Sequence, residues 1–194
     1  IADGDWSSDV CSSDLIARLF GMIAAWNRSR MAVVLAAGID CYIKRAWYEN
    51  TDFFTPGVWQ KLIQPELAQD VRLAHQAGAK FGYIITANAM PLLDLIAEVG
   101  VDVIIGIDPE TYDLDATKAK LGGRVCLWGG VNGHLTVEHG STETVRGEVS
   151  AALQSLGPDG FILSPVDNVR QDTERANGNV KTLIQSWQKW TGQD

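Results

Sequence analysis

The chain has 194 residues, 46% of them hydrophobic, which is enough apolar surface to fold around one sizeable core. The formal net charge of -8 argues against a phosphate-binding surface, which needs clustered Lys and Arg, so we expect no nucleic-acid partner. The longest apolar stretch, 15–41, is interrupted by WNRSR at 26–30, so no segment supplies the roughly 20 apolar residues of a membrane span.

The stretch DWSSDVCSSDL at 5–15 has the polarity of a linker and no apolar period of a helix or strand. It resembles a translated sequencing-library adapter fused in frame to a coding fragment, a contaminant of assembled environmental reads. The alternative is an ordinary polar terminus that buries too little surface to become ordered. We expect residues 1–15 to be a non-native tail, residues 16–194 to be the C-terminal portion of one domain, and the true N-terminus to be missing.

From residue 16 onward, helix-like and strand-like segments alternate. Thr55 and Pro56 are typical of a helix start, and Pro65 is expected to kink or divide the helix that they begin. Helical spacing predicts helices over 16–38, 55–78, 90–100, 114–123, 142–157 and 177–190. Short apolar runs predict strands over 39–46, 80–86, 101–107, 124–130 and 160–164.

The predicted strands are nearly continuous apolar runs, so both of their faces should be covered, as in a parallel sheet under helices. The fold class is therefore α/β, either an open doubly wound sheet or a partial (β/α)8 TIM barrel. Five strand-helix units cannot close a barrel that typically needs about 250 residues. A barrel here would lack its N-terminal strands, and its open edges and uncovered interior would favour aggregation.

The three cysteines, Cys11, Cys41 and Cys126, show no metal-ligand spacing, and the last two lie in apolar runs. A reducing cytoplasm fits them, and the acidic, polar start does not resemble a secretory signal. GGVNG at 129–133 lacks the GxGxxG spacing of a dinucleotide site and does not run directly into a predicted helix. We expect no cofactor and no metal.

In parallel α/β proteins the loops at the carboxyl ends of the strands form the site, which selects five loops here. Asp108 directly follows VIIGI and is suited to orient a substrate or accept a proton, or else it caps the turn before Pro109. Histidine is the side chain suited to carry protons at physiological pH, which makes His134 a second catalytic candidate, although a lone loop histidine is more often solvated. Asp167 is the third catalytic candidate, and a local salt bridge with Arg170 is its alternative.

Lys44 and Arg45 end an apolar strand, where a guanidinium can hold a carboxylate in a bidentate pair, although either side chain could instead pair with Glu49. Trp47 and Tyr48 could form the wall of an aromatic pocket or pack under the next helix. The remaining substrate-binding candidates come from the other loops: Thr86, Asn88, Asn132, Asn168 and Arg170. Glu143, Arg146 and Glu148 are expected to form a solvated charge pattern on a helix.

From about residue 31 to 190 the chain resembles the C-terminal part of the uroporphyrinogen decarboxylase superfamily, which also contains cobalamin- and coenzyme M-linked methyltransferases. The resemblance rests on the order and spacing of TDFFTPGVWQKLIQPEL, LLDLIAEVGVDVIIGID, LWGGVNG and GFILSPVDNVRQDT. It implies a (β/α)8 barrel with the site at the carboxyl ends of the strands, and often a homodimer.

The resemblance also identifies departures. Zinc-dependent methyltransferases of the superfamily carry His-x-Cys-Gly where this chain has ITAN at 85–88, and Ile85 and Ala87 offer no zinc ligand. The late histidine or cysteine of the family falls near 166–167, where Asp167 is the polar group. These differences disfavour the methyltransfer branch.

The first hypothesis is therefore a cofactor-independent lyase that decarboxylates a carboxylated substrate, which the resemblance suggests is a tetrapyrrole. Lys44, Arg45 and Arg170 would hold carboxylates, while Asp108 or Asp167 would orient a pyrrole N–H. The alternatives are a methyltransferase homologue without the zinc motif that binds a corrinoid or a methylated small molecule, and a non-catalytic barrel or inactive fragment. The expected location is cytoplasmic.

Overall fold

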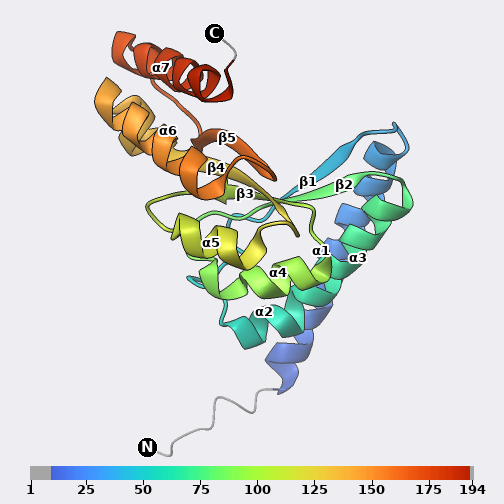
Figure 1. Cartoon of the computed structure of the whole chain (residues 1–194). Helices are drawn as coiled ribbons and strands as arrows, with labels where there is room; N and C mark the ends of the chain where they lie inside the picture. The colour runs from blue at the N-terminus through green and yellow to red at the C-terminus, as the bar shows by residue number, and fades with distance from the viewer. Residues whose placement is uncertain (1–9, 193–194) are drawn as a thin grey trace, which may run out of the picture.

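Five parallel strands form one sheet in the order β1-β2-β3-β4-β5 (Figure 1). The computed structural model describes residues 10–192. The strands are β1 Cys41–Arg45, β2 Lys80–Ile84, β3 Val103–Ile107, β4 Cys126–Asn132 and β5 Phe161–Val166. A helix separates each strand from the next, so all five strands run the same way and deliver their carboxyl ends to one edge of the sheet. The fold is α/β and is a partial TIM barrel, as the sequence predicts.

The helices occupy nearly the predicted positions. They are α1 Val10–Leu35, α2 Pro56–Leu62, α3 Gln64–Gln76, α4 Leu93–Val99, α5 Leu114–Leu121, α6 Thr142–Leu156 and α7 Glu174–Thr191, with a 3-10 turn, η2, over Met90–Leu92. The predicted break at Pro65 is confirmed, because α2 and α3 are separate helices with Pro65 in the first turn of α3. Thr55 caps α2 by accepting a hydrogen bond from the N–H of Val58.

The start of α1 differs from the prediction. The helix begins at Val10, six residues before the predicted start, so the end of the polar stretch 5–15 is helical, while residues 1–9 lie outside the described part of the chain.

The segment after β4, which was expected to be a loop, also differs from the prediction. A π-helical turn, η3, covers Gly133–Glu138, and its i to i+5 hydrogen bonding produces no apolar period that a search for α-helices recognises.

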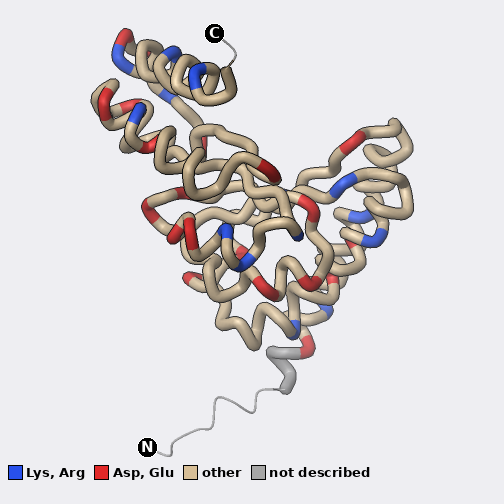
Figure 2. The backbone as a smooth tube through the Cα atoms, in the orientation of Figure 1, with Lys and Arg blue, Asp and Glu red and all other residues tan. Residues whose placement is uncertain are grey.

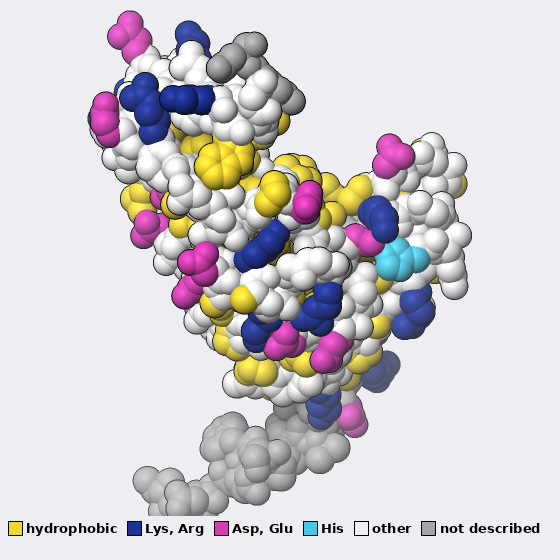
Figure 3. All heavy atoms as spheres, in the orientation of Figure 1, with side chains coloured by type: hydrophobic (Ala, Val, Ile, Leu, Met, Phe, Trp, Pro, Cys, Tyr) yellow, Lys and Arg dark blue, Asp and Glu magenta, His cyan; other side chains and the backbone are white. Residues whose placement is uncertain are grey.

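Acidic and basic residues are interspersed along the backbone in the view of Figure 2. None of the helices between residues 10 and 192 is long and apolar enough to cross a membrane. In the same orientation, hydrophobic side chains are visible in the notch between the α6–α7 pair and the β1 end of the sheet (Figure 3).

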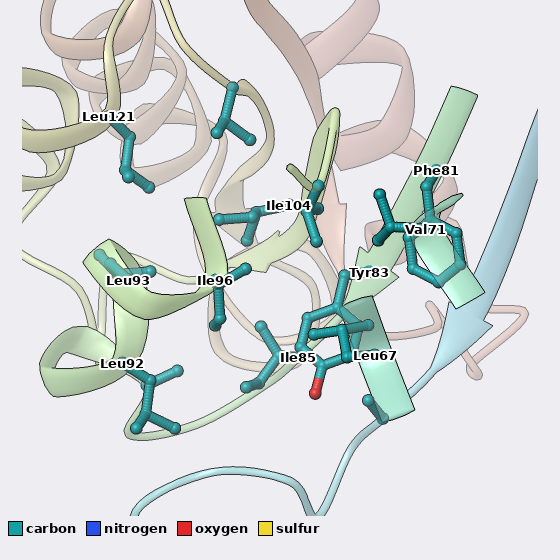
Figure 4. Packing of buried hydrophobic residues seen from close by; sticks show 14 of the residues in the cluster. Leu67, Val71, Phe81, Tyr83, Ile85, Leu92, Leu93, Ile96, Ile104 and Leu121 are labelled. Atoms are coloured by element: carbon teal, nitrogen blue, oxygen red, sulfur yellow. The ribbon is translucent and has the colours of Figure 1, made fainter. Parts of the chain in front are cut away.

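The outer face of the sheet carries the main core. Alternate strand residues Phe81, Tyr83 and Ile104 are fully buried there, against Leu67 of α3 and Ile96 of α4 (Figure 4). Burial of one large apolar side chain contributes about 1.5 to 3 kcal/mol, so this layer dominates the stability of the sheet. A smaller cluster, centred on Val137, Val145, Val149 and Leu183, packs α6 and α7 against the π turn.

The inner face of the sheet is only partly covered, as expected for a partial barrel and unlike a doubly wound sheet, which has helices over both faces. Ile43 of β1 and Ile162 of β5 each keep 40% of their surface exposed. In a closed barrel such inward side chains pack in layers contributed by all the strands, and five strands contribute only part of each layer. The continuous apolar strands are therefore those of a barrel wall rather than of a two-faced sheet.

Candidate functional site

A cavity of about 640 Å³ lies toward the carboxyl ends of the strands, and each of the five strands or the loop that follows it contributes residues to the lining. This volume falls in the usual range for small-molecule pockets. Of the predicted site residues, the cavity is lined by Arg45, Trp47, Tyr48, Thr86, Asp108, Asp167 and Asn168. The cavity therefore brings together an aromatic wall, one guanidinium and three carboxylates, because Asp52, which was not predicted, lines it beside Asp108 and Asp167.

The β1 exit supplies the aromatic wall and the cation. The guanidinium carbon of Arg45 lies 4.0 Å from the ring centre of Trp47, within cation–π range. Tyr48 meets Phe53 edge to face with ring centres 5.2 Å apart. Among the described residues the Arg45 guanidinium forms no ion pair, so its hydrogen-bond donors remain available to a ligand.

Asn50 fixes this exit and was not singled out from the sequence. Its side chain is almost fully buried, and its Nδ2 donates to the carbonyl oxygens of Trp47 at 3.1 Å and Thr86 at 2.9 Å. It thus ties the loop after β1 to the loop after β2. An asparagine in a polar loop carries no sequence signal that distinguishes this internal role from a solvated one.

Asp108 is held at the end of β3 by a second asparagine. Nδ2 of Asn132 donates to both carboxylate oxygens of Asp108, at 3.1 and 2.9 Å, and the N–H of Glu110 donates to Oδ1 at 3.0 Å. Oδ1 of Asn132 accepts from the N–H of Leu135 at 2.6 Å and caps the π turn. Asn132 therefore does not line the cavity but orients a carboxylate that does.

Glu148 of α6 extends this network. One carboxylate oxygen accepts from the N–H of Asn132 at 2.9 Å. Burial raises the pKa of Glu148, the hydrogen bond from Asn132 opposes that effect, and the charge of Asp108 adds to it. This half-buried position corrects the expectation that Glu148 belongs to a solvated pattern, whereas Arg146 and Glu143 do lie exposed with 3.9 Å between them.

Two non-glycine residues of the cavity have left-handed backbone conformations. The φ angles are 62° at Ala87 and 64° at Asp167, a region that few residues without special support adopt. The Asp167 carboxylate accepts from the N–H of Asn168 at 2.8 Å and pairs with Arg170 at 3.3 Å. The local salt bridge foreseen for Asp167 and Arg170 is thus present, and Arg170 lies outside the cavity lining.

The floor of the cavity includes Trp128 and Ser164, which the sequence analysis did not select. Nε1 of Trp128 donates to the hydroxyl of Ser164 at 2.9 Å, across neighbouring strands β4 and β5. Both are inward-facing positions within strands rather than loop residues. The alternation of side chains along β4 is the sequence signal that could have found Trp128.

Three further predicted residues lie away from the cavity. The Lys44 ammonium points to the helix side, 3.4 Å from Asp70 and 3.7 Å from Glu49, as side chains alternate along β1. The Asn88 side chain is exposed. His134 lies on the π turn, where Nδ1 is 3.0 Å from Oε2 of Glu138.

Glu138 joins the two exits after β4 and β5. Its side chain is only 2% exposed, and Oε1 accepts from the backbone N–H groups of Arg170 and Gln171. The bond from Arg170, followed by the contact with His134, lowers the pKa of Glu138. The loop carrying Asp167 is therefore attached to the π turn.

The position of the superfamily's zinc motif does not fit a metal. Ile85 is fully buried in the core, Ala87 has no ligand atom in its side chain, and the Thr86 carbonyl is already engaged by Asn50. Zinc in proteins is held by imidazole, thiolate or carboxylate groups, none of which is present at 85–88.

Comparisons with known proteins agree with this geometry. The family model described as uroporphyrinogen decarboxylase (URO-D) matches residues 12–190. A solved structure of a methyltransferase from Methanosarcina mazei superposes with a TM-score of 0.68 at 21% sequence identity, covering 81% of this chain and 44% of that one. The chain thus spans less than half of that protein, and at this identity the likeness concerns the fold. No curated protein matches the chain.

Proposed function

Since the chain belongs to the uroporphyrinogen decarboxylase family, we propose that it is part of a lyase that decarboxylates a carboxylated substrate without a cofactor, with a tetrapyrrole as the leading candidate. The observation that carries the proposal is the Arg45 guanidinium. It is stacked on Trp47 at the mouth of an aromatic cavity and forms no ion pair with the described residues. An unneutralised guanidinium beside flat aromatic walls suits a planar or ring-shaped ligand with carboxylate groups.

The proposed reaction requires the protein mainly to position the substrate and to stabilise the charge that develops on it. An acid first protonates the pyrrole ring, which becomes cationic. The bond between the carboxylate carbon and its neighbour then breaks, carbon dioxide leaves, and the electron pair of that bond neutralises the ring. Protonation of the neighbouring carbon and loss of the added ring proton restore the pyrrole, so the net change is the replacement of the carboxylate by hydrogen. Arg45 would hold a carboxylate of the substrate. Asp108, kept in place by Asn132, would accept a hydrogen bond from a pyrrole N–H and stabilise positive charge that develops on the ring.

Asp167 is the second carboxylate of the proposed site. Its left-handed backbone conformation turns it into the cavity lining, and Asn168 lies beside it. Two carboxylates on different strand exits can bind two N–H groups of one large ring. This arrangement favours a multi-ring substrate over a small carboxylic acid.

A binding experiment tests the substrate class. Uroporphyrin, which carries eight carboxylates, should quench tryptophan fluorescence on binding, whereas the same ring with amidated carboxyl groups should not. Arg45→Gln should weaken binding about tenfold, the equivalent of about 1.4 kcal/mol. Arg72→Gln, an exposed arginine on α3, is the matched control and should bind like the parent chain. Equal binding by all three proteins would refute the role of Arg45.

A turnover experiment tests the reaction. Uroporphyrinogen is incubated with the protein under anaerobic conditions, and the number of carboxyl groups in the product is measured by chromatography. Loss of carboxyl groups that is abolished in Asp108→Asn supports the lyase. Uroporphyrin binding without decarboxylation favours a non-catalytic barrel, and binding of a corrinoid in preference to uroporphyrin favours the methyltransferase homologue. We place the protein in the cytoplasm, where Cys41 and Cys126 stay reduced, and propose a homodimer for the full-length protein.

A further inference from the structure

The π turn places three metal-ligand side chains together outside the cavity. They are His134, Glu138 and His139, and one ligand atom from each lies within 4.8 Å of the other two. The i to i+5 hydrogen bonding of a π turn stacks residues five apart, so His134 and His139 meet with ring centres 4.6 Å apart. On a regular α-helix the same two residues would point in different directions.

The carboxylate between the two imidazoles is already oriented. Oε1 of Glu138 is occupied by the backbone N–H groups of Arg170 and Gln171, which leaves Oε2 directed at the histidines. Oε2 lies 3.0 Å from Nδ1 of His134 and 3.9 Å from Nε2 of His139. Hydrogen bonds to the outer oxygen of a metal-ligating carboxylate are a regular feature of built metal sites.

We propose that His134, Glu138 and His139 bind a divalent transition metal ion of the zinc class, with a fourth coordination position open. Tetrahedral zinc with bonds of about 2.0 to 2.2 Å places its ligand atoms about 3.3 to 3.6 Å apart, between the 3.0 and 3.9 Å that separate Oε2 of Glu138 from the two histidine nitrogens. Glu138 is buried and fixed, whereas the side chains of His134 and His139 are 54% and 38% exposed. The imidazoles can therefore rotate onto a metal that the carboxylate positions.

This site is separate from the position of the superfamily's zinc motif at 85–88 and departs from the sequence-based expectation of no metal. That expectation considered only cysteine spacing and one family motif. The coordinating pattern HxxxEH becomes a cluster only through the π turn. The side-chain amide of Gln171, 3.5 Å from Nε2 of His139, would move aside when that nitrogen binds a metal.

The proposal is tested by metal binding to the full chain, prepared without a polyhistidine tag and freed of metal. Zn²⁺ is titrated by calorimetry, and Co²⁺ by its visible absorption. The parent chain should bind one ion per chain. His134→Gln and His139→Gln should each weaken binding at least 30-fold. His75→Gln removes the chain's third histidine, which pairs with Asp102 instead, and should bind like the parent chain.

Each other outcome counts against the proposal. Absence of stoichiometric binding, or unchanged binding in both glutamine variants, would overturn it. A thiolate-to-cobalt charge-transfer band would place the metal on a cysteine instead. Thermal unfolding of the metal-free proteins shows whether the exposed substitutions leave the fold intact, and Zn²⁺ should raise the melting temperature of the parent and of His75→Gln only. No substrate is present, so the result is independent of the proposed lyase activity.

Discussion

Removing the amide of Asn132 should destabilise the protein far more than its position at a strand exit suggests. Asn132→Ala deletes the donor that bridges both oxygens of Asp108 and the acceptor for the N–H of Leu135. A hydrogen bond to a charged group contributes about 1.5 to 3 kcal/mol, and a helix cap about 1 kcal/mol. The backbone bond to Glu148 survives the substitution, so we expect a loss of about 3 kcal/mol.

Urea unfolding followed by tryptophan fluorescence measures this loss. Asn88→Ala is the matched control, because Asn88 is an exposed asparagine at another strand exit and should change stability by less than about 0.5 kcal/mol. Asn132→Asp keeps the cap but places a second carboxylate against Asp108, so its deficit should be at least as large at neutral pH and shrink in acid. If Asn132→Ala and Asn88→Ala unfolded at the same urea concentration, the bridging role assigned to Asn132 would be wrong.

Three further tests probe other parts of the structure. Burial raises the pKa of Glu148, so the folded state binds this proton more tightly than the unfolded state does. The free energy of unfolding of the parent chain should therefore fall as the pH rises above the ordinary pKa of glutamate. Glu148→Gln should flatten that part of the curve of stability against pH, measured by urea unfolding. Burial alone would raise the pKa of Asp102, but its partners, led by Lys80, lower it overall, so its contribution is present at neutral pH and lost as pH falls through the lowered value. Asp102→Asn should therefore cost about 1 to 2 kcal/mol at pH 7 and much less in acid, by urea unfolding at both pH values. Gly129→Ala should lower the melting temperature, because φ at Gly129 is +146° and the new Cβ would lie 2.5 Å from the backbone oxygen of Ile107. Gly147→Ala is the control: the new Cβ would meet open space on an exposed helix, so the melting temperature should rise slightly. Equal shifts of the melting temperature in the two variants would contradict the close approach at β4.

The order of elements and the location of the cavity could be predicted from the sequence because both depend on local patterns. Apolar runs mark the strands, Pro65 divides a helix, and parallel topology brings every exit to one edge. Arg45 and Asp108 therefore line one cavity, as expected for strand-end residues. The exposed fraction of each inward-facing strand residue could not be predicted, because it depends on how far the sheet curves and closes.

Side-chain direction and irregular backbone account for most of the differences between the predicted and the observed positions of the site residues. Lys44 and Arg45 are neighbours in sequence, yet alternation along β1 sends one to the helices and the other to the cavity. The π turn has no sequence period of its own, so His134 was considered alone, without Glu138 or His139. Asn50 and Asn132 act through buried amides whose partners are distant in sequence, 36 residues away for Asn50 and Thr86.

The hydrogen bonds that Glu138 accepts restrict how the rim of the cavity can move. Because one buried carboxylate holds the amides of Arg170 and Gln171, the loop after β5 cannot open without also disturbing the turn after β4. Those two amide protons should therefore exchange with solvent as slowly as those of a regular element, although they belong to a connecting segment. A ligand that binds beside Asp167 would therefore contact a rigid loop, and any conformational adjustment of the cavity would have to come from the β1 exit.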